Sequence, residues 1–446
     1  MSIIDLYDLF IHNPQITTDS RNCPKGSIFF ALKGDKFDGN QYAGKALASG
    51  CVYAVIDNPD YYIGKRTILV DNVLKTLQQL AHHHRKVLGL PIIGITGTNG
   101  KTTTKELLAA VLSTKFNLLY TEGNFNNHIG VPLTLLRLTH DHEMAVIEMG
   151  ASHPGDIKEL VDIVHPNYGI ITNVGRAHLE GFGSFEGVIR TKGELYDYIR
   201  RSKGKIFIKK ENEYLQSIAK GIEQITYGNG DDAFASGQVV SCDPFLVFNW
   251  KQQGKLHTVE THMIGSYNLD NVLAAVAVGR FFKIPAERIS RAIAAYEPTN
   301  NRSQFKKTDN NELIIDAYNA NPSSMKVALD NFITMPVQPK AIILGDMREL
   351  GPTSDELHAE VVEQIKKGQF DKVFLCGEHF SKVGKEFSPF ATTEAMVEEL
   401  RKQPLKGYHI LIKGSHSMGL EKLVDILYAI IEQDSFQLLI QEGENQ

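Results

Sequence analysis

The chain lacks the features that mark membrane, secreted and nucleic-acid-binding proteins. No run of residues approaches the roughly 18 uncharged apolar positions that a membrane-spanning helix requires. The start, MSIIDLYDLFIHN, carries Asp5 and Asp8 where a secretory signal would have positive charge followed by an unbroken apolar run. With 47 Lys and Arg against 52 Asp and Glu, and no basic block, the sequence argues against a nucleic-acid partner.

Cysteine is also scarce. The four cysteines, Cys23, Cys51, Cys242 and Cys376, are scattered, and they form no C-x-x-C pair and have no histidine at metal-binding spacing. We therefore predict buried, reduced thiols and a cytoplasmic location.

The length of 446 residues suggests about three domains of roughly 150 residues each. A helix-patterned stretch, VLKTLQQLAHHHRKVLG, leads to Pro91, and the polar stretch EPTNNRSQF follows near residue 300. We place the domains at residues 1–85, 86–301 and 302–446.

The two later domains have the alternating pattern of an α/β fold. From residue 91 the strand-like runs PIIGIT, MAVIEMG, YGIITNV and KIFIK alternate with helical patterns, which predicts a mostly parallel sheet covered by helices. Residues 233–264 contain short alternating runs and predict antiparallel strands. Strand and helix alternate four times in the last third, which predicts a Rossmann-like, doubly wound domain.

The segment GITGTNGKTTT (94–104) joins a strand-like run to a helix-like run. Its glycines, Lys101 and Thr102 supply what a triphosphate needs: unhindered N–H groups, a helix N-terminus, a lysine for the outer phosphates and a hydroxyl for Mg²⁺. The strict nucleotide-loop pattern G-x-x-x-x-G-K-[ST] fails, because Ile95 stands where its first glycine should be. An ordinary glycine-rich turn is the alternative, and the strand-and-helix context favours triphosphate binding.

Three further side chains are candidates on position alone. Glu148 ends the next strand-like run, where an acid associated with Mg²⁺ would stand, although a structurally paired glutamate fits equally well. His178 follows another strand end, and a single histidine is more often structural than functional. Lys192, taken by itself, has the pattern of a solvated helix lysine.

The runs GITGTNGKTTTKE, TEGNFNNHIGVPLTLL, IEMGASHPGDI, TNVGRAHLEGFGS, TKGE, DAYNANPSSM, ILGDMRELG and LIKGSHSM occur in this order. Together they resemble the Mur ligase family of peptidoglycan synthesis across essentially the whole chain. Within that family, YNANPSSM resembles the branch that adds D-alanyl-D-alanine to UDP-MurNAc-tripeptide. The resemblance implies an ATP-dependent amide ligase acting through an acyl phosphate and a tetrahedral intermediate, with UDP-MurNAc-pentapeptide, ADP and phosphate as products.

The resemblance also implies roles for individual residues. It implies that Lys101 binds phosphate, that Lys192 is carbamylated and that ATP is used with Mg²⁺. The implied catalytic residues are Lys101, Glu148, His178 and Lys192. The implied metal ligands are Thr102, Thr121, Glu148, His178 and Lys192. The implied ATP contacts are Gly97, Thr98, Asn99, Gly100, Lys101, Thr102, Thr103, Asn268, Asn271, Arg302 and Asp316.

Substrate contacts follow from the same resemblance. The first domain is expected to hold the UDP-sugar end, with Ser20 and Arg21 in TDSR, and the last domain to bring D-Ala-D-Ala. The remaining implied contacts are Asn126, Asn127, Tyr318, Asn319 and Asn321. We expect a monomer without a membrane span, because nothing in the sequence requires a dimer.

Three positions depart from the family pattern. Asn40 replaces the histidine of FDGH, Tyr267 replaces the histidine of an HN pair, and His416 replaces the arginine of KGSR. The first two keep a polar or stacking group. His416 removes a permanent charge, which puts that substrate contact in doubt.

Two kinds of alternative function remain. A ligase of the same fold, of MurE type or folylpolyglutamate type, is the rival enzyme; the first carries a DNPR-type motif where this chain has YNANP, and the second lacks the first domain. A nucleotide-gated switch is the rival from another class, and it would not need Glu148, His178 and Lys192.

Overall fold

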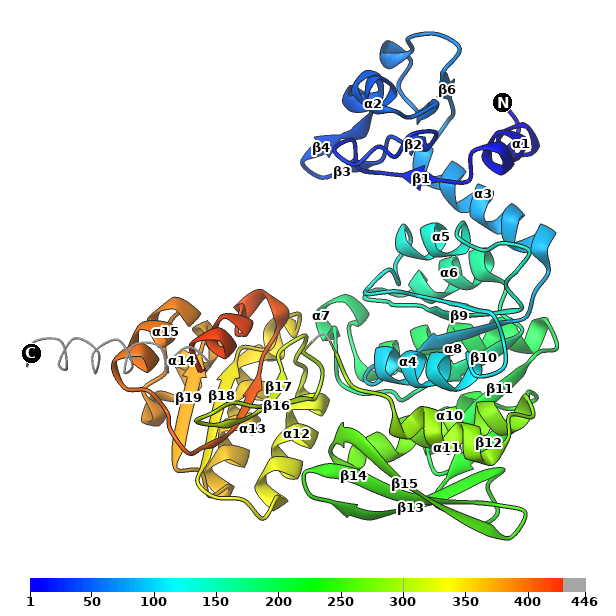
Figure 1. Ribbon diagram of the computed structural model, residues 1–446. Coiled ribbons are helices and arrows are strands. Elements are labelled where there is room, and N and C mark those ends of the chain that lie inside the picture. The colour runs from blue at the N-terminus through cyan, green and yellow to red at the C-terminus, as the bar shows by residue number, and fades with distance from the viewer. Residues whose placement is uncertain (300, 428–446) are drawn as a thin grey trace, which may run out of the picture.

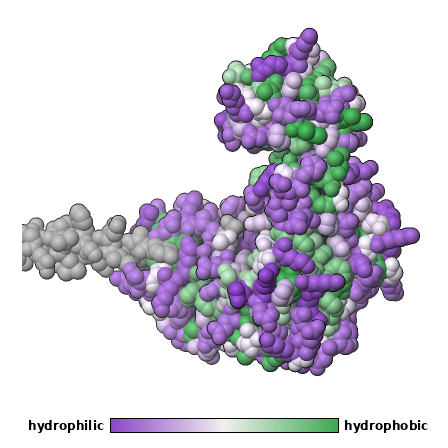
Figure 2. All heavy atoms as spheres, turned by 45° about the vertical axis from the view of Figure 1, so that its right-hand side comes forward, coloured by the Kyte–Doolittle hydropathy of each residue, from purple (hydrophilic) through white to green (hydrophobic). Residues whose placement is uncertain are grey.

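The computed structural model describes residues 1–299 and 301–427, which form three successive α/β units (Figure 1). We call these the N-terminal unit (α1 to α3), the central unit (β7 to α11) and the C-terminal unit (β16 to η6). The N-terminal unit projects from the rest through a narrow neck, and the visible surface is largely hydrophilic (Figure 2). Residues 428–446, the end of the predicted last domain, lie outside the described residues.

The N-terminal unit is built on a small parallel sheet of order β1-β2-β5-β6. Its inner strand β2 is buried at every position, as expected where both faces of a parallel sheet are covered. The elements are α1 (Ile3–His12), β1 (Ile16–Thr17), β2 (Ile28–Phe30), β3 (Lys33–Gly34), β4 (Phe37–Asp38), η1 (Gly39–Tyr42), α2 (Ala43–Ser49), β5 (Tyr53–Ile56), η2 (Pro59–Tyr61), β6 (Thr67–Leu69) and α3 (Val73–Leu88).

The central unit contains a nine-stranded sheet of order β15-β14-β13-β12-β11-β10-β7-β9-β8. From β13 through β12, β11, β10, β7 and β9 to the edge strand β8, neighbouring strands run parallel. Strand β14 pairs antiparallel with β13 and with β15. Both predictions for this region are therefore confirmed. The strands are β7 (Ile92–Thr96), β8 (Leu118–Tyr120), β9 (Met144–Glu148), β10 (Tyr168–Ile171), β11 (Lys205–Lys209), β12 (Glu223–Gly228), β13 (Ala235–Cys242), β14 (Phe245–Gln252) and β15 (Lys255–Ile264).

Helices cover both faces of the central sheet, and each face has its own buried cluster. One cluster joins α5, α6 and α8 to α1 and α3, so the neck of the molecule shares the central core. The other joins α4, α10 and α11 to the antiparallel strands. The helices are α4 (Lys101–Leu112), α5 (Gly130–Leu135), α6 (Asp156–Val164), α7 (Leu179–Phe182), α8 (Phe185–Arg201), α9 (Glu213–Ile218), η3 (Ser266–Asn268), α10 (Leu269–Phe281) and α11 (Ala286–Ala294).

The C-terminal unit is a five-stranded sheet of order β16-β17-β20-β18-β19, parallel except at β16. The predicted doubly wound arrangement is confirmed; β16 was not predicted, because its sequence QFKK is polar. The elements are β16 (Gln304–Lys307), β17 (Glu312–Asp316), α12 (Pro322–Thr334), β18 (Lys340–Gly345), η4 (Gly351–Thr353), α13 (Ser354–Lys367), β19 (Lys372–Cys376), α14 (Glu378–Val383), η5 (Lys385–Phe387), α15 (Thr393–Lys402), β20 (His409–Lys413) and η6 (His416–Met418).

Two sequence expectations concern the chain as a whole. None of the helices within residues 1–299 and 301–427 is long and apolar enough to cross a membrane. The cysteines are all unpaired, but only Cys51 and Cys376 are buried. The prediction of buried thiols is wrong for Cys23 and Cys242, which are partly exposed at loop and strand-end positions.

Candidate functional site

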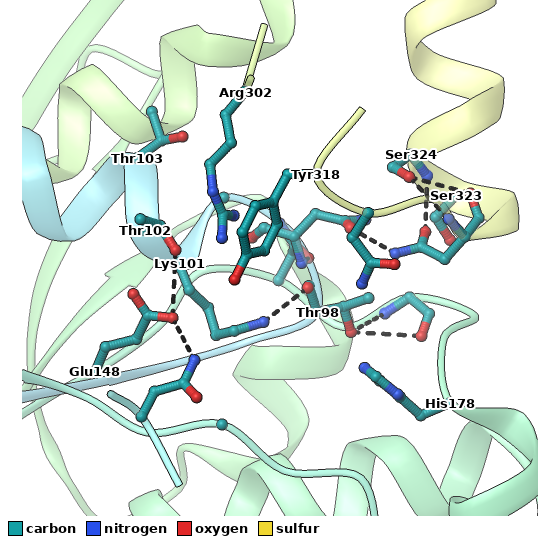
Figure 3. Close-up of a pocket in the computed structure, with 18 of the residues that line it drawn as sticks. Thr98, Lys101, Thr102, Thr103, Glu148, His178, Arg302, Tyr318, Ser323 and Ser324 are labelled. Carbon is teal, nitrogen blue, oxygen red and sulfur yellow. Dashed lines mark hydrogen bonds between the residues drawn. The ribbon is translucent and has the colours of Figure 1, made fainter. Parts of the chain in front are cut away.

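A cavity of about 930 Å³ lies between the central and C-terminal units (Figure 3). This volume suits a nucleotide or a comparable ligand. Most of the predicted site residues line it: Thr98, Asn99, Gly100, Lys101, Thr102, Thr103, Asn126, Asn127, Glu148, His178, Asn268, Asn271, Arg302, Asp316, Tyr318, Asn319 and Asn321.

Strand register explains why residues distant in sequence meet here. Ile95 of β7 pairs with Glu148 of β9, and Thr96 pairs with Ile171 of β10. The carboxyl ends of these three parallel strands therefore lie side by side, which is where open α/β sheets bind ligands.

The glycine loop is shorter than the strict nucleotide-loop pattern requires. Ile95 is fully buried within β7, so the loop begins only at Gly97, and the missing first glycine is a strand residue. Gly97 has a φ of 144°, and a Cβ there would lie 2.0 Å from the Oγ1 of Thr172. Gly100 has a φ of 75°, and a Cβ there would lie 2.6 Å from the Oδ1 of Asn271. Both positions therefore require glycine.

Lys101 opens α4, and its side chain folds back over the loop. Its Nζ donates to the carbonyl oxygens of Gly97 at 2.8 Å and Thr98 at 3.0 Å. Burial lowers the pKa of Lys101, and the negative charge of Glu148 opposes that shift. The loop therefore holds a cation, beside helix N–H groups that have no acceptor within the helix.

Glu148 is buried at the end of β9, where it is hydrogen bonded on one side only. Its Oε1 accepts from Asn126 at 2.8 Å and from the Thr102 hydroxyl at 3.3 Å. Its Oε2 is buried and has no hydrogen-bond partner among the described residues. The Thr121 hydroxyl accepts from the Glu148 backbone N–H at 3.0 Å, so Thr121 lies beneath the cavity wall rather than in its lining.

His178 is the N-cap residue of α7 and has a φ of 50°. Its Nδ1 contacts the carboxylate of Glu349 in the C-terminal unit. His178 therefore lines the cavity at the junction of two units, and its functional role stays a prediction, because a structural histidine satisfied by an ion pair fits the same position.

Lys192 lies on α8 and is only 2% exposed, so the interpretation of a solvated helix lysine is wrong. Its Nζ lies 3.4 Å from the carbonyl oxygen of Ala151, which lines the cavity. Burial lowers the pKa of Lys192 well below its usual value, and the charge of Lys101 lowers it further. The amine is thereby biased towards its neutral, nucleophilic form.

Asn268 and Asn271, which are predicted ATP contacts, bond each other rather than pointing freely into the cavity. Asn271 donates to Asn268 at 2.8 Å and accepts from Thr104 of α4 at 3.0 Å. These bonds hold the start of α10 against α4.

Asn127 forms local hydrogen bonds, because its Oδ1 accepts from the N–H groups of Ile129 and Gly130.

Charged and aromatic groups enter from the C-terminal side. The Arg302 guanidinium stacks on the ring of Tyr318 at 3.6 Å, and its Nε has no acceptor among the described residues (Figure 3). Asp316 ends β17 and accepts from Lys413 at 2.5 Å. Arg302 is therefore oriented by an aromatic face and keeps a donor free for a ligand.

Asn321 connects the C-terminal unit to the glycine loop. Its side chain caps α12 by accepting from the N–H of Ser324 at 2.9 Å, and it donates to the Oδ1 of Asn99 at 2.8 Å. Asn319 accepts from the N–H of Ala320 through its side chain at 2.8 Å. The YNANP segment thus lies directly over the loop.

The remaining predicted contacts, Ser20 and Arg21, lie in the N-terminal unit and do not line the cavity. Arg21 is exposed and pairs with Asp19 at 2.8 Å. The structure therefore does not bring these two residues to the other predicted site residues.

The three departures from the family pattern each have a defined environment. Asn40 is fully buried and donates to Asp57 at 2.9 Å. The Tyr267 hydroxyl lies 2.9 Å from the Ser303 hydroxyl. His416 is exposed and stacks on Tyr318 with ring centroids 5.8 Å apart, so an aromatic contact stands where a charge was expected.

The charged residues in the cavity lining that the sequence did not predict include Glu349 and Lys413. Lys413 interrupts the apolar run HILIKG at the end of β20, beside Asp316 of β17, and a lysine within such a run is itself a usable signal. Glu349 lies within ILGDMRELG, where nothing in the local pattern separates it from any loop glutamate.

Within residues 1–299 and 301–427, no three His, Cys, Asp or Glu side chains come together as a ready-made metal site. The residues of these types that were predicted to bind metal are Glu148 and His178. Thr102, Thr121 and Lys192 complete the predicted set.

Three family models match the chain. The model described as the Mur ligase middle domain matches residues 95–279, the Mur ligase, glutamate ligase domain matches residues 301–416, and the Mur ligase family, catalytic domain, matches residues 12–85.

Two similar proteins carry the same name. The UDP-N-acetylmuramoyl-tripeptide--D-alanyl-D-alanine ligase of Bacillus subtilis (strain 168) is 34% identical over 427 residues, covering 92% of each chain. Its namesake from Escherichia coli (strain K12) is 32% identical, covering 92% of this chain and 93% of the relative.

Solved structures give the same match. MurF from Acinetobacter baumannii has a TM-score of 0.84 at 30% identity, covering 93% of each chain. MurF from Thermotoga maritima in complex with ADP has a TM-score of 0.85 at 25% identity, covering 96% of this chain and 99% of that structure.

Proposed function

The chain belongs to the Mur ligase family, and from this premise we propose that it joins D-alanyl-D-alanine to the terminal carboxylate of UDP-MurNAc-tripeptide at the expense of ATP. The products are UDP-MurNAc-pentapeptide, ADP and phosphate, and the reaction is a cytoplasmic step of peptidoglycan synthesis. One observation carries the proposal: a cation, an unpaired buried carboxylate oxygen and the YNANP segment converge on one cavity.

ATP is assigned to the cavity beside the glycine loop. The loop offers Lys101, the N-terminus of α4 and glycines that allow close backbone approach, and Arg302 offers a free donor opposite. The bonds within the loop are local, so Lys101 can exchange its two carbonyl acceptors for phosphate oxygens. Gly97, Thr98, Asn99, Gly100, Lys101, Thr102, Thr103, Asn268, Asn271, Arg302 and Asp316 are the proposed nucleotide contacts.

The residues present fit a Mg²⁺ ion. The Oε2 of Glu148 is a buried carboxylate oxygen without a partner, and the Thr102 hydroxyl lies against the other oxygen of the same group. Oxygen donors of this kind are the ligands that Mg²⁺ prefers. Thr102 and Thr121 would contribute hydroxyls near one Mg²⁺, and Glu148, His178 and a carbamate on Lys192 would hold a second. When bound, Mg²⁺ would reduce the electrostatic repulsion between the anionic triphosphate and the anionic carboxylate.

We propose that Lys192 carries a carbamate. Its neutral amine attacks CO₂, forming a C–N bond and releasing one proton, and this converts a buried amine into an oxygen ligand. The lowered pKa of Lys192 and its burial beside the cavity wall support this proposal.

The proposed reaction has two steps, phosphoryl transfer to the tripeptide carboxylate and then amide formation. The tripeptide carboxylate attacks the γ-phosphorus of ATP, the bond to the ADP oxygen breaks, and an acyl phosphate forms. Lys101 and Arg302 offset the charge that develops on the phosphoryl oxygens. The amine of D-Ala-D-Ala then adds to the acyl carbon, and phosphate leaves from the tetrahedral intermediate.

Three domains divide this work. We propose that residues 1–85 hold the UDP end through Ser20 and Arg21, that residues 86–301 hold ATP, and that residues 302–446 bring the dipeptide. Asn126, Asn127, Tyr318, Asn319 and Asn321 are the proposed substrate contacts near the phosphates. We also propose that the protein acts as a monomer.

Phosphate release tests the proposal. With ATP and Mg²⁺ present, release should require both the tripeptide nucleotide and D-Ala-D-Ala, because ATP is consumed only when the carboxylate and the amine are both bound. The assay should be run with tripeptides ending in lysine and in diaminopimelate. Equal ATP turnover without either substrate would instead indicate a nucleotide-gated switch.

A further inference from the structure

His178 and Glu349 face each other across the junction between the central and C-terminal units. The Glu349 carboxylate contacts the Nδ1 of His178, and both residues line the cavity. His178 precedes α7, and Glu349 lies in the loop between β18 and η4. Two units are therefore joined at a side chain proposed for the site.

The contact determines which imidazole nitrogen carries a proton. The buried Nδ1 of His178 meets hydrogen-bond geometry with no described residue, and its ion-pair partner is the Glu349 carboxylate, which only accepts hydrogen bonds, so the contact favours a proton on Nδ1. In a neutral imidazole the other nitrogen, Nε2, then keeps its lone pair. No described residue forms a hydrogen bond with Nε2.

The loop that carries Glu349 is held firmly. The N–H of Met347 donates to the Nε2 of the buried His358 at 3.0 Å, and the N–H of Arg348 donates to the Ser415 hydroxyl at 3.0 Å. On the other side, the N–H of Glu180 in α7 donates to the Glu349 carbonyl oxygen at 3.3 Å. The carboxylate is thus presented from a fixed backbone.

Both residues also have an unusual backbone conformation. His178 has a φ of 50° and Glu349 a φ of 62°, in the left-handed region that side-chain-bearing residues seldom adopt. Such conformations persist where the surrounding structure enforces them, and they gather at functional sites. Here they aim the two side chains at each other.

We propose that Glu349 is a positioning residue for His178: its carboxylate keeps the imidazole proton on Nδ1 and turns the Nε2 lone pair towards the cavity. What His178 then does there rests on the proposed function, in which it binds Mg²⁺. A carboxylate behind a ligating histidine is a recurring way to fix its tautomer. Because Glu349 belongs to the C-terminal unit, the histidine is oriented only while that unit lies against the central one.

A second ion pair between the same two units provides a matched control. Arg176 of the central unit and Glu360 of α13 lie 3.7 Å apart, and both side chains are half exposed. Glu360→Ala removes a carboxylate from the same junction without touching His178. A merely structural role for Glu349 would make the two variants behave alike.

Nitrogen NMR of protein labelled with ¹⁵N-histidine tests the proposal without metal or substrate. At an alkaline pH of about 8.5, the wild-type His178 should show the Nδ1–H tautomer. The resonance is identified by its loss in His178→Asn. Glu349→Ala should shift it towards the Nε2–H form, and Glu360→Ala should not. A wild-type Nε2–H or doubly protonated ring, or an unchanged ring in Glu349→Ala, would overturn the proposal.

A second readout is the Mg²⁺ concentration for half-maximal phosphate release. Glu349→Ala should raise it by about 10- to 100-fold. Glu349→Gln should raise it less, because the amide oxygen still accepts from Nδ1–H, and Glu360→Ala should leave it unchanged. An equal rise in Glu349→Ala and Glu360→Ala would overturn the positioning role. If the wild-type protein released no phosphate, the proposed function would fail while the NMR result still decided the role of Glu349.

Discussion

Lys101→Ala should reduce kcat/KM for ATP by about 10³-fold, which corresponds to about 4 kcal/mol of lost transition-state stabilisation. Lys101 is the cation held by the glycine loop, and the triphosphate and the carboxylate nucleophile both carry negative charge. Steady-state phosphate release at saturating tripeptide and dipeptide measures the effect.

The fold should survive this substitution. Burial lowers the folded-state pKa of Lys101 below its unfolded value, so between these two pKa values the unfolded chain binds more protons and stability rises with pH. The protonated lysine therefore does not stabilise the fold, and the melting temperature of Lys101→Ala should equal or exceed that of the wild type.

The exposed Lys158 of α6 offers the activity control Lys158→Ala, which should stay fully active. A loss of less than tenfold in Lys101→Ala would contradict the assignment.

Lys192→Ala should lower kcat by about 10³-fold while ATP still binds at the loop. The proposed carbamate is an oxygen ligand that alanine cannot replace, whereas Lys101 and the N-terminus of α4 are unaffected. Acetate, a small carboxylate, should restore part of the activity of Lys192→Ala by occupying the vacated space. Kinetics with increasing acetate, together with binding of a fluorescent ATP analogue, measure both effects.

Two controls make this result specific. Lys192→Arg introduces a permanent positive charge and forms no carbamate, and it should be inactive and unresponsive to acetate. Wild-type protein supplied with ¹³C-bicarbonate should show a carbamate carbon resonance that is missing in Lys192→Ala. Full activity of Lys192→Ala, or no such resonance, would remove the proposed modification.

The sequence was sufficient for most of the architecture. The apolar run PIIGIT predicted β7, whose isoleucines are all fully buried, and the alternation in the last third predicted the second parallel sheet. The short edge strand β8 and the polar strand β16 were not predicted. Strand β8 spans three residues and β16 has the polar sequence QFKK, so the first is too short and the second too polar to show an alternating pattern.

Parts of the site could not be read from local pattern. The burial of Lys192 depends on how α8 packs against the cavity wall, which the spacing of the TKGE segment does not show. The contact between Glu349 and His178 depends on the approach of two units, and their sequence separation carries no signal. The glycine loop, in contrast, was recognisable from its sequence. Ile95 departs from the strict nucleotide-loop pattern because β7 extends to Thr96, so the loop starts at Gly97.

The central claim is that a peptide carboxylate, and not water, accepts the phosphoryl group. It is tested most directly with UDP-MurNAc-tripeptide whose terminal carboxylate is labelled with ¹⁸O, incubated with ATP, D-Ala-D-Ala and the wild-type protein. Mass spectrometry of the released phosphate should find one ¹⁸O atom, because the oxygen that attacked the γ-phosphorus leaves with it when the amine displaces phosphate. Phosphate without ¹⁸O would contradict the acyl-phosphate route and the proposed function with it.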